Sequence, residues 1–339
     1  LKDAASTSIY GSRGSNGVII VSTKRGRKGQ ALKLDFNAYT GLSNIERRIQ
    51  FMSASEYALF MADARDDSYI QSGGDLSVLP IDRPFSYRYD QNLINNPESI
   101  PSYDHFESIL QTGITQSYQL SASGSTENAR YMVSGEYFDQ KGIVKNTGYK
   151  RYSFRSNVDL DLNEHLTIGL NLAPNYIITD DKDTEGKSGL IHQVINSVPI
   201  LPPRLGYWGE SEAFSDYPLS NETPSALAKI EHLRDVQTRT QVLANVYAQV
   251  NIMPGLSFRS SFGANYYDTR RDRFENQIIV RTGDPKGENW NSQALNWLNE
   301  NILSYNKSFE KHQLGAVLGL TSQKQEDKAS YIQGTGFAN

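Results

Sequence analysis

The chain has 339 residues, of which 38% are hydrophobic, and its formal net charge is -4. No apolar run approaches the roughly 20 residues of a membrane-spanning helix, and the basic surplus of a nucleic-acid-binding protein is absent. Because the sequence contains no Cys, a disulfide, a thiolate zinc site and a Cys nucleophile are excluded.

The first 29 residues differ in pattern from the rest of the chain. Residues 2–10 predict a short helix that ends at Gly11, and the unbroken apolar run 18–23 predicts a strand buried on both faces. The turn between them, 11–17, is rich in glycine, but it lacks the Lys and hydroxyl pair of a phosphate-binding loop and stands in a helix, loop, strand order. We therefore interpret it as a tightly packed turn. The basic connector 24–30 marks a predicted domain boundary, with one unit at 1–29 and another at 30–339.

From residue 32 onward, apolar and polar side chains alternate with a period of two, as in strands with one apolar and one polar face. The pattern is clearest in 151–162, which a tight turn joins to a second strand as a hairpin. Several strands reach the roughly 9–11 residues that cross a bilayer. The nine predicted strands are 32–39, 116–124, 129–138, 151–162, 166–178, 241–252, 256–267, 295–309 and 313–321.

The connections between these strands alternate between short and long. Short turns are predicted at 125–128, 163–164, 253–255 and 310–312. Long connections are predicted at 42–115, 139–150, 179–240 and 268–294. This order is typical of outer-membrane barrels, which have short periplasmic turns and long extracellular loops, whereas a soluble β-sandwich has no reason to place every short turn at one end. Within the first long connection, Ser53 and Glu56 form a capping box, so we expect a short helix there.

Motifs for metals and catalysis are weak. Asp181 to Gly186 matches the opening of a calcium loop, but His192 stands at the twelfth position, where a bidentate Glu is required. An acidic, solvated loop is the favoured interpretation and calcium binding stays open. The five His residues show no metal-ligand spacing, and no Ser lies in a nucleophile elbow. We therefore predict no enzyme, no cofactor and no metal centre.

The aromatic residues, 20 Tyr, 13 Phe and three Trp, suit the girdles of a barrel and also a soluble core. Those in the predicted long loops are candidates for substrate contact, because an aromatic ring offers apolar area to the C–H face of a sugar. The candidates are Tyr207, Trp208 and Trp290. The alternative is that they are girdle residues at the barrel rim.

The segment 1–26 has the sequence LKDAASTSIYGSRGSNGVIIVSTKRG. It resembles the end of the plug domain in the SusC/RagA family of TonB-dependent transporters, and the resemblance continues at 111–116, 130–134, 142–147, 150–155 and 254–256. It implies an all-β fold, with the C-terminal piece of the plug at 1–29. Residues 30–339 would then form the first part of a transmembrane antiparallel β-barrel, about nine of about 22 strands.

The same resemblance implies TonB-dependent import of oligosaccharides, or of other large nutrients, across the bacterial outer membrane. The implied partners are a SusD-like lipoprotein over the extracellular loops, the TonB-ExbB-ExbD complex that pulls on the plug, the oligosaccharide or peptide substrate, and outer-membrane lipid. Since neither a signal peptide nor a TonB box is visible, we expect the sequence to be part of a longer chain. The alternatives are a peptide importer, a barrel-based receptor or adhesin, and a soluble carbohydrate-binding sandwich.

In this scheme the glycine-rich turn of the plug packs against the inner wall of the barrel. The predicted packing residues are Gly11, Arg13, Gly14, Asn16 and Gly17. We expect Arg13 to pair with a lumen-facing carboxylate, for which the candidates are Asp159, Asp161 and Glu136.

Overall fold

The computed structural model describes residues 26–184, 186, 189–204, 224–309 and 312–337. The helix and strand predicted within 1–25 lie outside the described residues, and so do the predicted packing residues Gly11 to Gly17. Among the described helices, none combines the length and the apolar character that spanning a membrane requires.

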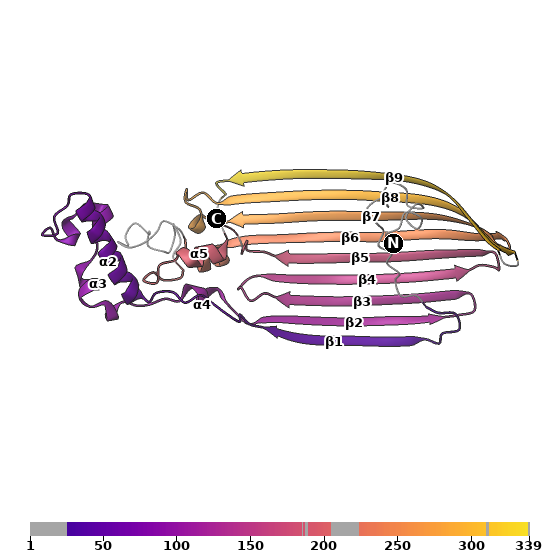
Figure 1. Ribbon diagram of the computed structural model, residues 1–339, viewed down its shortest axis with the longest axis horizontal. Coiled ribbons are helices and arrows are strands. Elements are labelled where there is room, and N and C mark those ends of the chain that lie inside the picture. Colours follow the sequence, from indigo (N-terminus) through magenta and orange to yellow (C-terminus); the bar gives the residue numbers. More distant parts are fainter. Residues whose placement is uncertain (1–25, 185, 187–188, 205–223, 310–311, 338–339) are drawn as a thin grey trace.

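Nine strands form one antiparallel sheet in which each strand pairs with the next along the chain (Figure 1). The strands are β1 (Lys33–Ser43), β2 (Gly113–Ser125), β3 (Ala129–Lys141), β4 (Gly148–Asp161), β5 (Leu166–Asp180), β6 (Leu233–Met253), β7 (Leu256–Glu275), β8 (Lys286–Phe309) and β9 (His312–Thr335). The prediction of nine strands in an antiparallel, up-and-down order is confirmed. Over the described residues the sheet is open, with β1 and β9 as its edges.

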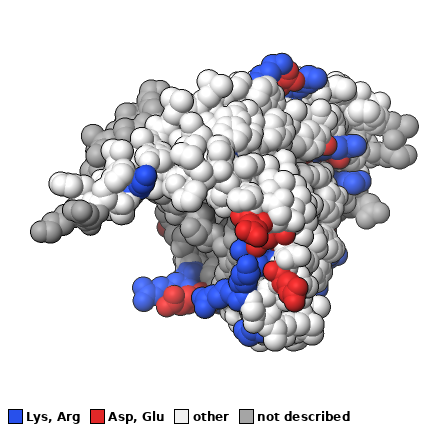
Figure 2. All heavy atoms as spheres, turned by 90° about the vertical axis from the view of Figure 1, so that its right-hand side faces the viewer, with Lys and Arg blue, Asp and Glu red and all other residues white. Residues whose placement is uncertain are grey.

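The two faces of the sheet differ in polarity. Phe36, Leu120 and Leu170 lie on the same face and are 67%, 58% and 43% exposed. The opposite face carries buried polar side chains such as Asn157 and Asp159. A sheet in water would cover its apolar face with a second layer, so an uncovered apolar face indicates lipid as its surroundings. From the short-turn end the molecule is hollowed on one side, and its charged residues form a few small groups (Figure 2).

The short and long connections lie at opposite ends of the sheet (Figure 1). The described turns at 126–128, 162–165 and 254–255 are at one end. The connections 44–112, 142–147, 181–232 and 276–285 are at the other end, which we call the long-loop end. The loop asymmetry predicted from the sequence is therefore confirmed.

The extents of the last four strands were predicted too short. β6 begins at Leu233, β9 continues to Thr335, and the loop predicted at 268–294 is only 276–285, because β7 and β8 extend into it. Beyond Tyr266 the apolar face of β7 becomes charged, with Asp268, Arg270 and Asp272. Both faces of the strand are exposed to water there, so the sequence no longer alternates between apolar and polar residues. The backbone hydrogen bonds between the strands nevertheless continue.

Aromatic residues mark the place where the apolar face changes character. Four tyrosines occupy one cross-strand row of that face, with ring centroids 5.2–6.4 Å apart. They are Tyr118, Tyr137, Tyr152 and Tyr176. Tyrosine prefers the interface between acyl chains and water. We infer that the membrane ends near this row. The strand β7 then continues for roughly 30 Å of its length beyond Tyr266, at about 3.3 Å per residue.

Helices occur only in the long connections of the described chain. They are α2 (Ala54–Gln71), α3 (Gln91–Asn95), α4 (His105–Ile109), α5 (Leu190–Asn196) and α6 (Ala226–His232), with short 3-10 turns η2 (Pro80–Asp82), η3 (Phe85–Tyr87), η4 (Pro97–Ser99) and η6 (Gln277–Ile279). The capping box predicted for α2 is present, since Ser53 and Glu56 cap each other's backbone. The helix is longer than predicted.

The main apolar core of the described residues lies in these loops and not on the sheet. It joins α4, the 142–147 turn, α5 and α6, through Phe106, Ile109, Val144, Leu190, Val194, Ala226, Leu227 and Ile230. Three connections that are far apart in the sequence therefore fold as one unit over the ends of the strands.

Candidate functional site: a charged cluster at the barrel rim

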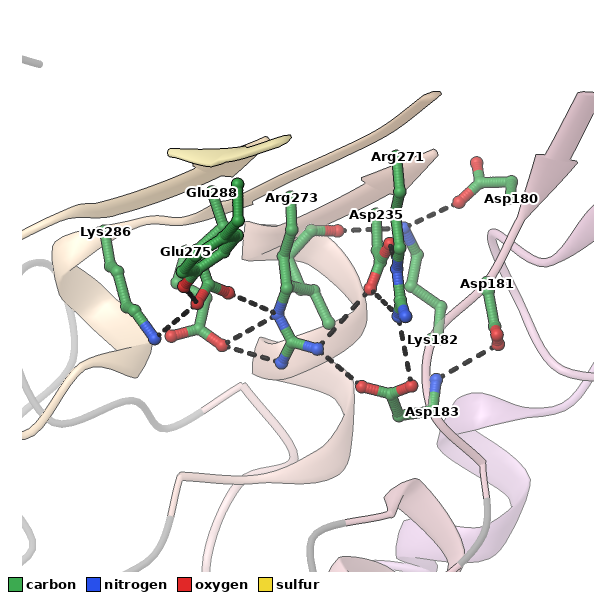
Figure 3. A network of polar contacts seen from close by, with 12 residues as sticks. Asp180, Asp181, Lys182, Asp183, Asp235, Arg271, Arg273, Glu275, Lys286 and Glu288 are labelled. Atoms are coloured by element: carbon green, nitrogen blue, oxygen red, sulfur yellow. Dashed lines mark hydrogen bonds and ion pairs between the residues drawn. The ribbon is translucent and has the colours of Figure 1, made fainter. Parts of the chain in front are cut away.

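A group of charged side chains lies on the polar face at the long-loop end (Figure 3). We call it the rim cluster. It consists of Asp183 from the connection after β5, Asp235 from β6, Arg271, Arg273 and Glu275 from β7, and Lys286 and Glu288 from β8. The cross-strand register explains the assembly, because Asp235, Arg273 and Glu288 occupy one row and Arg271 lies in the neighbouring row of the same face.

The most buried member is Asp235, whose side chain is 0% exposed. Arg271 binds it with two parallel hydrogen bonds, Nε to Oδ1 at 2.7 Å and Nη2 to Oδ2 at 2.6 Å. Such a bidentate pair fixes the orientation of both groups. The hydrogen bond to Asp235 raises the pKa of Arg271 above its ordinary value, against the opposing effect of burial.

Asp183 links the loop to the wall. Its Oδ2 accepts a hydrogen bond of 2.6 Å from Nη1 of Arg273, and its Oδ1 lies 3.4 Å from Nη2 of Arg271. Burial acts to raise the pKa of Asp183, but the hydrogen bond from Arg273 and the charges of both arginines outweigh it, so this pKa lies below its ordinary value. The carboxylate is therefore ionised and ties the start of the 181–232 connection to β7.

The outer part of the cluster is also paired. Arg273 donates to Glu275 at 2.7 Å, and Nζ of Lys286 lies 2.8 Å from Glu288. Burial acts to raise the pKa of Glu288, but hydrogen bonds from Lys286 and Tyr331 outweigh it and this pKa is lowered. Since the acidic and basic groups face one another, the cluster is suited to holding elements together.

Asp183, which belongs to the calcium-like motif, is engaged with arginine in the described structure, and Glu185 of the same motif lies outside the described residues. The Asp183 carboxylate faces two guanidinium groups, and the described residues contain no group of three or more Asp, Glu or His side chains placed to hold a metal ion. The His192 ring contacts Asn196 on α5. Calcium binding by this stretch stays a prediction.

Trp290 lies on β8, whereas the sequence placed it in a loop. Its ring stacks on Tyr331 with centroids 5.1 Å apart, and the guanidinium of Arg271 lies 5.6 Å from the ring centroid. The hydroxyl of Tyr331 donates to Glu288 at 2.7 Å. The indole is thus joined to the rim cluster on the polar face, and its contact with a substrate stays a prediction. Tyr207 and Trp208 lie outside the described residues.

The three carboxylates proposed for Arg13 lie on the polar face and already have partners in the wall. Asp159 accepts a 2.7 Å hydrogen bond from Tyr247, Asp161 binds Arg130 at 3.2 Å, and Glu136 binds Arg151 at 2.8 Å. Arg13 itself lies outside the described residues, so the pairing stays a prediction.

Two cavities lie along the described part of the sheet, and the larger one has both amide and apolar side chains in its wall. The larger, of about 720 Å³, is lined by amide side chains such as Asn171, Asn245 and Gln323. The smaller, of about 370 Å³, is lined in part by Glu136 and Arg151. A polar, hollowed face is what an aqueous lumen requires.

The sequence alone does not reveal the rim cluster. Its members come from separate connections and strands, with Asp183 and Arg273 90 residues apart. Arg271, Arg273 and Glu275 do not stand out in the sequence, because Arg270 and Asp272 beside them are charged as well and no alternation marks one face of the strand. Only the cross-strand register reveals its partners.

Comparisons with known proteins agree with this architecture. No family model matches the chain. A TonB-dependent receptor, P3, of Formosa agariphila is 29% identical over 99% of this chain and 31% of its own length. The TonB-dependent receptor SusC of Bacteroides thetaiotaomicron is 25% identical over 78% of this chain and 26% of its own. The chain therefore spans about a third or less of these relatives, which are named as receptors and not as enzymes.

Solved structures share the fold. The chain superimposes on the structure of the RagAB peptide transporter with a TM-score of 0.76, at 24% identity, over 99% of this chain and 39% of that one. A second RagAB structure, in an open-open state, gives the same score over 100% of this chain. The nine strands thus correspond to part of a larger barrel wall.

Proposed function

We propose that the complete protein is a SusC/RagA-type TonB-dependent receptor of the outer membrane, and that it imports large nutrients across that membrane in a TonB-dependent manner. The observation that carries the proposal is the sheet itself. One face is apolar and uncovered, and the other is polar and hollowed, as in a wall between lipid and an aqueous lumen.

The proposal includes a division of the chain. Residues 1–29 would be the end of the plug and residues 30–339 the first part of the barrel. The plug turn, with Gly11, Arg13, Gly14, Asn16 and Gly17, would pack on the polar face, where the smaller cavity offers Glu136 beside Arg151. A TonB-ExbB-ExbD complex would move the plug, and a SusD-like lipoprotein would close the extracellular side, which is the long-loop end.

For the substrate we propose an oligosaccharide, with a peptide as the second candidate. Aromatic residues at Tyr207, Trp208 and Trp290 favour sugars, since aromatic rings bind the C–H faces of pyranoses. Similarity to a RagAB peptide transporter favours the alternative. In either case Trp290, on the polar face beside the rim cluster, is a proposed contact.

The test is uptake by intact cells. We would delete the gene, restore it, and follow fluorescent oligosaccharides and fluorescent peptides in parallel, with and without functional TonB. We expect the deletion and the TonB defect to abolish uptake of one substrate class. If the deletion leaves both classes unaffected, import is wrong; if surface binding is lost but no TonB-dependent uptake exists, the receptor or adhesin alternative is correct.

A further inference from the structure

The part of the first long connection from α2 to η4, residues 54–99, forms a lobe that Figure 1 places beyond α4 and α5, away from the sheet. We call it the α2 lobe. Between α2 and α3 it contains the segment 75–88, which we call the pinned loop. Arg83 holds this loop in place and is itself 2% exposed.

The contacts of Arg83 join the loop to α2 and to two tyrosines. Its guanidinium donates to Asp66 on α2 and, through Nε, to the carbonyl of Val78 at 3.1 Å. It also lies over the rings of Tyr69 and Tyr89, 4.9 Å and 5.6 Å from their centroids. A buried guanidinium with this many partners fixes the segment around it.

The pinned loop turns large apolar side chains toward solvent. Leu79, Ile81 and Phe85 are 63%, 61% and 70% exposed. Pro80 and Pro84 stand beside them and restrict the backbone further. Exposed apolar groups on a fixed backbone lose little conformational entropy on binding, which is the property of a preorganised contact surface.

The net charge around the pinned loop indicates which kind of partner could bind it. Residues 44–112 contain 11 Asp and Glu, five Arg and no Lys, which gives a net charge of -6, although the whole chain carries only -4. Asp75 and Asp82 are exposed within the pinned loop itself. An acidic surface repels the phosphate groups of a lipid surface and the same lobe of a second copy, and it attracts a basic surface.

We infer that the pinned loop is a docking surface for a partner protein that presents apolar side chains within a basic rim. This inference rests on the proposed function, which supplies the partner: the SusD-like lipoprotein at the long-loop end. Leu79 and Phe85 form the apolar centre of the contact, and the acidic residues around them provide attraction that depends on salt.

The test uses the full-length receptor in detergent and the purified lipoprotein encoded beside it, with binding measured by biolayer interferometry. The double variant Leu79→Asp with Phe85→Asp should weaken binding by about 30- to 100-fold, the size of effect seen at the centres of interfaces. The control is Ile195→Asp on α5, a similarly exposed apolar residue outside the α2 lobe, which should leave binding unchanged. Wild-type affinity should fall between about 0.05 M and about 0.5 M NaCl.

The possible outcomes distinguish a wrong docking surface from a wrong function. If the wild type binds and the double variant binds within about twofold of it, the docking inference is wrong and the proposed function stands. If the wild type does not bind the lipoprotein, both fail. Self-association of the receptor, or binding to lipopolysaccharide vesicles, that the double variant abolishes would also overturn the inference, because it would assign the surface to another occupant.

Discussion

The sheet and the loop core use the same kinds of residue in opposite ways. On the sheet, Leu170 and Phe154 are uncovered, while in the loops Ile109 and Ile230 are almost fully buried. The difference lies in the solvent of each region. Apolar side chains in lipid gain nothing by folding inward, whereas those in water are stabilised by about 25 cal/mol for each Å² that they bury.

The largest expected loss of stability comes from removing a large apolar side chain from the loop core. Ile230 on α6 is 1% exposed and contacts the core shared by three connections. Ile230→Ala should destabilise that unit by about 2–5 kcal/mol, because it removes buried contacts and leaves a cavity. Hydrogen exchange of α4, α5 and α6 in the full-length protein would measure it. Unchanged protection of α4 would show that the three connections fold independently.

Charge on the apolar face should have the next largest effect. Leu170→Lys places an ammonium group toward lipid and should cost about 2–4 kcal/mol near the middle of the bilayer. Ser330→Lys, on the same face of β9 but in the row of Asn291 beyond the membrane, should cost almost nothing. Denaturant titration of the refolded full-length receptor in liposomes compares them. Equal costs would contradict our placement of the membrane boundary.

The ion pairs of Asp183, which join the 181–232 connection to the sheet, should depend on pH. The pKa of Asp183 is lowered in the folded protein, so its stabilising contribution is complete above its ordinary value of about 3.8 and is lost as the pH falls through the lower, folded pKa. Asp183→Asn should loosen the start of the 181–232 connection by about 1–3 kcal/mol. Hydrogen exchange near neutrality and again below about pH 4 should show acid loosening in the wild type only. A variant that still loosens in acid would assign the effect to another group.

The smallest effect concerns the end of one helix. Ser53→Ala removes the side chain that caps α2 and should destabilise that helix by about 1 kcal/mol. Limited proteolysis of the α2 lobe would detect it as faster cleavage near residue 53. Lys324→Ala, which breaks an exposed ion pair with Glu326, serves as a control with little effect. Equal cleavage rates in the two variants would argue against the capping contribution.

The sequence by itself determined the strands, the start of α2 and the order of short and long connections. The alternation in 151–162 predicts a strand with one apolar face, and the pairing of Ser53 with Glu56 predicts the start of α2, because each signal depends on residues that are neighbours in the chain. Short and long connections in turn predict which strand ends lie together. These features require no knowledge of distant contacts.

Tertiary structure decided the rest. The sequence gives no signal for the extension of β7 to Glu275, because both faces of the strand are exposed to water there. Backbone pairing with the neighbouring strands maintains this part of β7. The meeting of Asp183, Asp235 and Arg273 depends on the register of two strands and on the position of one loop, and a shift of one residue in either strand would turn its side chain to the other face. The loop core likewise joins connections that only the closed hairpins bring together.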